Sequence, residues 1–76
     1  MIVNDIKNRL REMCNHILFE YNGVSCGIDP ISSTHFDMWY GDKTYIAKSL
    51  ECVMNATVFD GKTLEEIAYY IENLEL

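Results

Sequence analysis

The sequence predicts an α+β fold in which an antiparallel meander of three to four strands is packed on one face by N-terminal and C-terminal helices, in the order α-β-β-β-β-α-α. Asn22-Gly23 lies between two stretches in which apolar and polar residues alternate, the strongest short signal for a β-hairpin. Apolar residues recur at helical spacing near both ends of the chain. At 76 residues, the chain is expected to form one domain, 1–76, with one hydrophobic core.

A two-residue turn at Asn22-Gly23 determines which residues of the two strands face each other, because both central positions of a type I′ turn need positive φ. Three apolar pairs form one face: Tyr21–Val24, Phe19–Cys26 and Ile17–Ile28. The pairs on the other face are Glu20–Ser25, Leu18–Gly27 and His16–Asp29. A slip of one residue would move the apolar set into water, so the turn and the hydrophobic pattern predict the same register.

The remaining elements of the N-terminal half follow from changes in the apolar period. An amphipathic helix is expected over the apolar positions Ile2, Val3, Ile6, Leu10 and Met13, ending around 13–15, where the period changes from about 3.6 to 2. Strands are expected at 16–21, 24–29, 34–40 and 43–46. Asp29-Pro30 is expected to end the second strand, because proline lacks the N–H that a ladder needs. Gly41-Asp42 is expected to form a second two-residue turn.

Two helices are expected in the C-terminal part. Ser49 is a plausible cap for a short helix, and Asp60-Gly61-Lys62 is expected to form a turn. The last helix begins with a capping box, in which Thr63 and Glu66 satisfy each other's backbone N–H groups. Its buried stripe is Leu64, Ile67, Ala68, Ile71 and Leu74.

The composition argues against two classes of protein. Twelve Asp and Glu residues face six Lys and Arg, and a net charge of −6 does not suit binding to nucleic-acid phosphates. Three cysteines, an odd number at wide spacing, do not form the disulfide framework of a small secreted domain, so a reducing cytoplasm is the expected location. The N-terminus has no apolar stretch of signal-peptide length, so neither export nor membrane insertion is expected.

No motif predicts catalytic residues, a bound cofactor or a metal. Gly61-Lys62-Thr63 matches only the end of a phosphate-binding P-loop, which needs glycine where this chain has Ala56. A small metal-binding or thiol-dependent protein using Cys14, His16 and His35 is an alternative, although no pair of these residues has zinc-knuckle spacing. Free cysteine is among the most buried residue types, so core positions are expected for the cysteines.

Trp39 is predicted on the sheet face opposite the main core, together with Leu18 and Ile46. If helices cover only one face, these side chains form an exposed apolar cluster, and such patches tend to mark partner surfaces. The alternative is that a loop or the short helix near Leu50 folds over them and closes a second small core.

Tyr69 and Tyr70 add to the predicted interaction residues Leu18, Trp39 and Ile46, because neighbours about 100° apart on a helix cannot both face one core. We therefore expect a non-enzymatic protein-interaction or accessory domain that uses an apolar patch on an acidic surface. A protein partner or self-association as a homodimer, through the last helix or the open sheet face, would add burial to a thin core.

The acidic residues near the C-terminus and three short segments of the sequence give two further expectations. Acidic residues gather on the predicted last helix, which leaves an acidic nucleic-acid mimic as an alternative; they are Glu65, Glu66, Glu72 and Glu75. The segments Tyr21-Asn22-Gly23, Trp39-Tyr40-Gly41-Asp42 and Phe59-Asp60-Gly61-Lys62-Thr63-Leu64 resemble those of small single-domain proteins of Gram-positive bacteria and their mobile elements. This resemblance implies a bacterial source and carries no activity.

Overall fold

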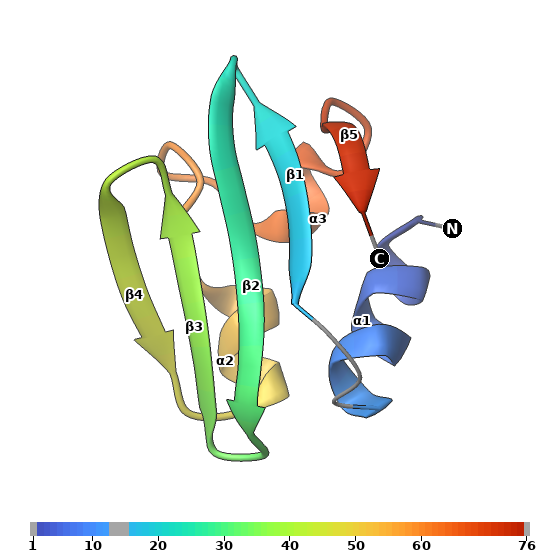
Figure 1. Ribbon diagram of the computed structural model, residues 1–76, viewed down its shortest axis with the longest axis vertical. Coiled ribbons are helices and arrows are strands. Elements are labelled where there is room, and N and C mark those ends of the chain that lie inside the picture. Colours follow the sequence, from blue (N-terminus) through green and yellow to red (C-terminus); the bar gives the residue numbers. More distant parts are fainter. Residues whose placement is uncertain (1, 13–15, 76) are drawn as a thin grey trace.

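A computed structural model describes residues 2–12 and 16–75, which form one five-stranded antiparallel sheet and three helices. The strands are β1 (Ile17–Tyr21), β2 (Val24–Ser32), β3 (His35–Tyr40), β4 (Lys43–Ala47) and β5 (Glu72–Glu75). The helices are α1 (Ile2–Glu12), α2 (Leu50–Asn55) and α3 (Leu64–Ile67). The order across the sheet is β4-β3-β2-β1-β5 (Figure 1). The predicted α+β class is confirmed, with a fifth strand added to the meander.

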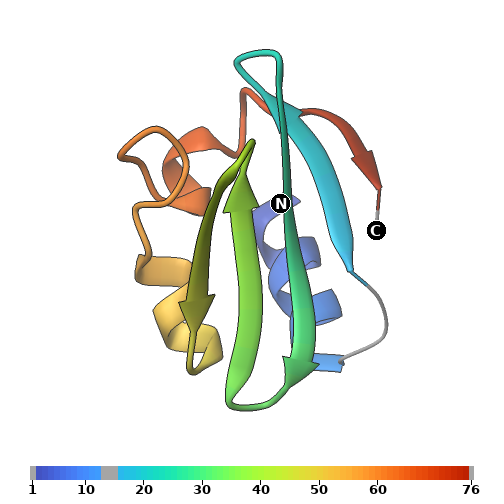
Figure 2. The same ribbon diagram turned by 60° about the vertical axis from the view of Figure 1, so that its left-hand side comes forward.

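The helices all lie on one side of the twisted sheet, as Figure 1 and Figure 2 show. The apolar side chains buried between the two layers are Ile6, Leu10, Ile17, Phe19, Tyr21, Cys26, Ile28, Phe36, Met38, Ala47, Val53, Ala56, Phe59, Leu64 and Ile67. The apolar face predicted for the first hairpin is therefore the sheet side of the core. In the described part of the chain, no helix combines the length and the apolar character needed to cross a bilayer.

The register of the first hairpin is confirmed from Ile17–Ile28 to Tyr21–Val24. Asn22 and Gly23 have φ values of 56° and 72°, as a type I′ turn requires. The β3–β4 hairpin also has a two-residue turn, at 41–42, in which Gly41 has a positive φ of 61° and Asp42 does not, and Tyr40 faces Lys43. Two-residue turns thus determine both registers.

The second strand is longer than predicted. Instead of ending at Asp29, β2 continues through Pro30 to Ser32, and Pro30 pairs with Phe36 of β3. The ladder with β1 ends at Ile28, so Pro30 has a described strand on one side only. Proline is tolerated at such an edge position because one of its sides needs no backbone donor.

The predicted last helix is wrong beyond Ile67. The helix ends there, a turn follows at 68–70, and Glu72–Glu75 forms β5 beside β1. Pairing with β5 satisfies the backbone groups along the outer edge of β1, which a continued helix would leave open. Ile71 and Leu74 still contact the core as expected, but not from a helix.

The predicted helix starts are confirmed by their hydrogen bonds. The hydroxyl of Ser49 accepts from the backbone N–H of Cys52 at 3.1 Å. In the capping box, the Thr63 hydroxyl accepts from the N–H of Glu66 at 3.2 Å, and the Glu66 carboxylate accepts from the N–H of Thr63 at 2.9 Å. The helix α1 buries Ile6 and Leu10 as expected. The predicted end of this helix at 13–15, including Met13, lies outside the described residues.

Candidate functional site

The candidate site is the side of the sheet that the described helices leave uncovered, called the open face below. Side chains alternate between the two faces of a strand, so every second residue of β1 to β4 points away from the core. The open face includes Leu18, Glu20, Ser25, Gly27, Asp29, His35, Asp37, Trp39, Thr44 and Ile46.

Trp39 lies at the centre of this face, and its indole covers Gly27. The two residues face each other across β2 and β3, and the same row continues to Leu18 on β1 and to Thr44 on β4. A Cβ atom added at Gly27 would stand 2.6 Å from Cε2 and from Cη2 of Trp39, and closer still to Cζ2. Only glycine leaves room for an indole to lie flat on a strand in this way. Gly27 is buried although it lies on the open face.

Two hollows lie on either side of the indole. The larger hollow, of about 500 Å³, is lined by Asp29, Asp37, Met38, Trp39, Gly41, Thr44, Tyr45 and Ile46. The smaller hollow, of about 270 Å³, is lined by Leu18, Phe19, Glu20, Ser25, Cys26, Trp39, Asn73 and Glu75. Trp39 is the residue that the two linings share. The indole is therefore a wall of both hollows.

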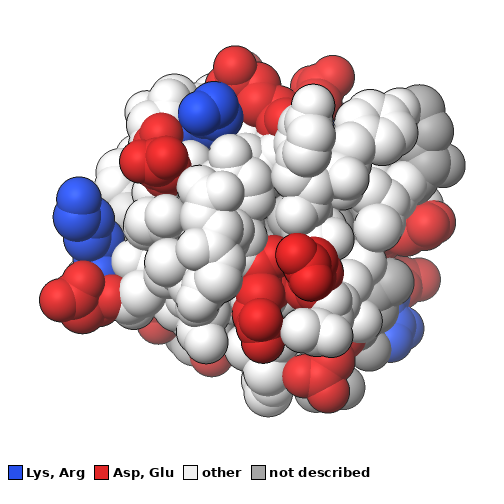
Figure 3. All heavy atoms as spheres, turned by 90° about the horizontal axis from the view of Figure 1, so that it is seen from above, with Lys and Arg blue, Asp and Glu red and all other residues white. Residues whose placement is uncertain are grey.

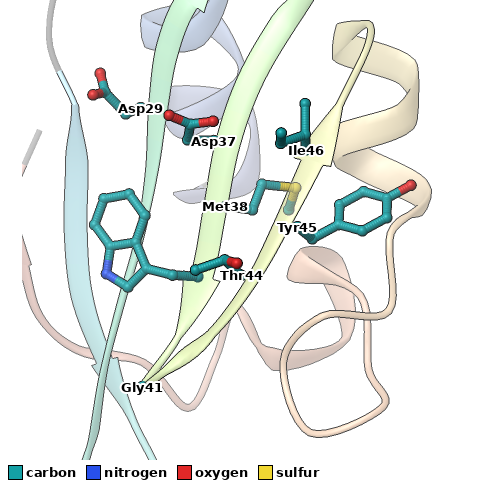
Figure 4. A pocket seen from close by; sticks show the side chains of 8 residues that line it. Asp29, Asp37, Met38, Gly41, Thr44, Tyr45 and Ile46 are labelled. Carbon is teal, nitrogen blue, oxygen red and sulfur yellow. The ribbon is translucent and has the colours of Figure 1, made fainter.

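Two carboxylates stand side by side in the larger hollow. Asp29 of β2 is paired with Asp37 of β3, and Ile46 of β4 continues their row (Figure 4). Directly opposed like charges destabilise a sheet. Nε2 of His35 lies 2.8 Å from Oδ1 of Asp37, so a protonated histidine would offset part of the charge of that carboxylate.

The structure brings three of the five predicted interaction residues together. Trp39 shares the larger hollow with Ile46, which is 52% exposed, and the smaller hollow with the half-buried Leu18. Tyr69 and Tyr70 lie in the turn after α3 and are 79% and 69% exposed. Both tyrosines are thus separated from the Trp39 cluster in the fold.

Tyr69 and the helix α2 both lie on the helix side of the sheet, away from the open face. Tyr69 lines a different hollow, with Val3 and Lys7 of α1, on the helix side of the sheet. Leu50 packs against the main core, so α2 does not cover Trp39. The alternative of a second small core under this helix is therefore not what the fold shows.

Of the residues of the metal or thiol alternative, His35 lies at the open face, where it contacts Asp37. Cys14 lies outside the described residues, and the described part of the chain contains no cluster of three or more His, Cys, Asp or Glu able to hold a metal ion. Burial raises the pKa of the Cys26 thiol to about 11, against a weaker opposing effect of a backbone hydrogen bond, so this thiol is protonated at neutral pH. Cys26 is in the core as expected, whereas the core position expected for Cys52 is wrong, because this residue is exposed on α2.

The acidic cluster expected on one helix is divided by the fold. Glu65 and Glu66 belong to the first turn of α3, whereas Glu72 and Glu75 belong to β5. Glu75 faces Leu18 of β1 and lines the smaller hollow. A single helical row of carboxylates, on which the idea of a nucleic-acid mimic depended, is therefore absent from the described residues.

Sequence reasoning placed Trp39 on the correct face but missed Gly27 and the Asp29–Asp37 pair as parts of the site. A glycine inside a predicted strand is a signal for close approach by another group, and Gly27 was such a residue. The acidic pair had no comparable signal, because it depends on the register between β2 and β3. Comparisons of the chain with protein-family models, with curated proteins and with solved structures find no match.

Proposed function

We propose that this domain is a non-enzymatic protein-interaction module that contacts its partner, another protein or a second copy of the chain, through the open face with Trp39 at its centre. The supporting observation is the indole that lies over Gly27 between two hollows, on the side without helices. Tryptophan is enriched among the residues that dominate binding energies. Because Gly27 already supports the ring, little side-chain entropy remains to be lost on binding. The cytoplasmic location stays a prediction.

The test compares Trp39→Ala with Tyr69→Ala, which removes an exposed aromatic ring from the helix side. Each variant and the wild type are used to capture proteins from a bacterial lysate, and a captured protein is then purified and titrated in a calorimeter. Trp39→Ala is expected to raise Kd by about thirtyfold, the effect of a 2 kcal/mol hot spot, whereas Tyr69→Ala leaves Kd unchanged. Sedimentation velocity of the domain alone measures self-association in the same way.

Thermal melts of both variants separate binding from folding. The proposal requires that Trp39→Ala loses binding while most of the molecules remain folded at the temperature of the titration. It is wrong if folded Trp39→Ala binds the purified partner, or itself, as tightly as the wild type does. It is equally wrong if Tyr69→Ala causes the larger loss, because the contact would then lie on the helix side.

A further inference from the structure

We infer that the larger hollow receives an arginine side chain from a basic segment of the partner protein. The inference rests on the proposed function and adds the chemistry of the partner to it. The hollow is lined by an indole, an apolar wall and two adjacent carboxylates. Together these groups can contact both the apolar stem and the charged end of an arginine side chain. The parts of this match come from three neighbouring strands: Asp29 from β2, Asp37 and Trp39 from β3, and Ile46 from β4.

Acidic side chains dominate the open face. Glu20 of β1, Asp29 of β2 and Asp37 of β3 lie on it. The described strands place no Lys or Arg there, and His35 of β3 contacts Asp37. Lys43 pairs with Tyr40 and lines a hollow on the other side of β4, and Lys48 follows the end of β4 and is not part of the lining. A positively charged partner is therefore attracted to this face and an acidic one is repelled.

Acidic side chains also outnumber basic ones at one end of the molecule. Figure 3 views the end that lies at the top of Figure 1 and shows more Asp and Glu side chains than Lys and Arg side chains on it. The chain as a whole carries a net charge of −6. This field favours encounter with a basic segment, and added salt weakens it.

The two carboxylates match a guanidinium in geometry. Opposed side chains on neighbouring strands have Cβ atoms about 4.5–5.5 Å apart, and Asp29 and Asp37 are such a pair. A guanidinium carries five N–H donors in a rigid plane and can donate to both carboxylates at once, which an ammonium point charge does less well. Binding would also remove the repulsion between the two carboxylates in the free domain.

The rest of the hollow suits the stem of the arginine. One row further along the strands, about 6.6 Å away, lie Trp39 and Thr44, while Ile46 stands beside Asp37. The methylene groups of an arginine can lie against the indole and the isoleucine while the guanidinium reaches the carboxylates. The edge of the guanidinium plane can also contact the face of the indole.

The experiment titrates the folded full chain, labelled with nitrogen-15, with a blocked pentapeptide that contains one arginine between glycines. The control peptides carry citrulline, which has the same shape without the charge, or lysine. We expect amide shifts at residues 27–29, 37–39 and 44–46, and a Kd about fivefold lower for the arginine peptide than for citrulline. The lysine peptide is expected to bind with intermediate affinity, and all differences shrink as salt is added.

Matched variants locate the contact. Asp29→Asn and Asp37→Asn each remove one charge from the hollow, whereas Asp60→Asn removes the same charge from a distant turn, where φ is 58° and asparagine is well tolerated. The first two variants are expected to raise Kd for the arginine peptide about fivefold, and Asp60→Asn is expected to have no effect beyond its share of the net charge. Equal effects of all three variants would overturn the inference, since they would show general attraction to an acidic protein.

The outcomes also separate this inference from the proposed function. If arginine and citrulline peptides bind equally, the inference is wrong, and the proposed function still holds as long as a purified partner requires Trp39. If the open face is instead covered by a second copy of the chain, sedimentation shows a dimer that Trp39→Ala abolishes and the peptide shifts are absent at the hollow. That result overturns the inference and assigns the face to self-association.

Discussion

The contact between Gly27 and Trp39 makes a quantitative prediction about stability. In Gly27→Ala, the new methyl group would occupy the position of the indole, with 2.6 Å to Cε2 and to Cη2. The ring must therefore leave the strand or the backbone must move. We expect Gly27→Ala to be destabilising in the wild type and stabilising when Trp39 is alanine.

The expected free energies follow from two opposing terms. Replacing glycine by alanine inside a strand contributes about 0.5–1 kcal/mol of stability by reducing the freedom of the unfolded chain. Forcing a bulkier group into an occupied space costs about 1–3 kcal/mol. The net loss for Gly27→Ala is thus about 0–2.5 kcal/mol with the indole present, and a gain of about 0.5–1 kcal/mol remains without it. The coupling free energy between the two positions is therefore about 1–3 kcal/mol.

Urea unfolding of the four proteins of this cycle, followed by far-ultraviolet circular dichroism, measures the coupling. Circular dichroism is chosen because Trp39 is the only tryptophan and its fluorescence disappears in two of the proteins. Additivity of the two substitutions within about 0.5 kcal/mol would refute the reasoning, because it would mean that the indole does not lie on Gly27. The same Gly27→Ala variant is expected to weaken partner binding, since it displaces the ring from its support.

Three further predictions concern single positions. Asp29→Asn is expected to raise the free energy of unfolding by about 0.2–1 kcal/mol by removing repulsion with Asp37; a loss of stability in urea, or a gain that high salt does not reduce, would contradict this. Thr63→Ala is expected to cost about 1 kcal/mol through loss of the cap, and an unchanged urea midpoint would show that the cap is not needed. Burial raises the pKa of Cys26 to about 11, so iodoacetamide near neutral pH should modify Cys52 quickly and Cys26 only at the rate of unfolding. Peptide mass spectrometry measures both rates, and equal rates would contradict the burial of Cys26.

The parts of the fold that could be predicted are those in which a local turn determines a long-range pairing. Asn22-Gly23 needs positive φ at both residues, and this requirement alone fixes which side chains of β1 and β2 share a face. The two-residue turn at 41–42, with positive φ at Gly41 alone, likewise fixes the register of β3 and β4. The position of Trp39 opposite the core follows from alternation along β3.

The last helix shows where local patterns mislead. The apolar residues Ile71 and Leu74 continue the helical spacing of α3, yet they contact the core from a turn and a strand. The apolar spacing indicates which residues are buried. Ile71 and Leu74 can be buried by a continued helix or by a turn followed by a strand, so the spacing does not distinguish the two. The conformation of this segment is decided by the edge of β1, which would be unpaired without β5. No residue near the helix indicates that this edge needs a partner strand.

The register between β2 and β3 shows why the site itself could not be predicted. Ser32 faces His35 around a two-residue connection, and a regular ladder continued from this pair would place Ile28 opposite Trp39 and thus mix the two faces of the sheet. The register shifts by one residue between Pro30 and Ser32, so that Ile28 faces Met38 in the core instead. This shift also brings Gly27 under the indole and Asp29 beside Asp37. The irregularity that keeps the core apolar therefore builds the proposed binding face as well, and a substitution that regularised this turn would be expected to disrupt both.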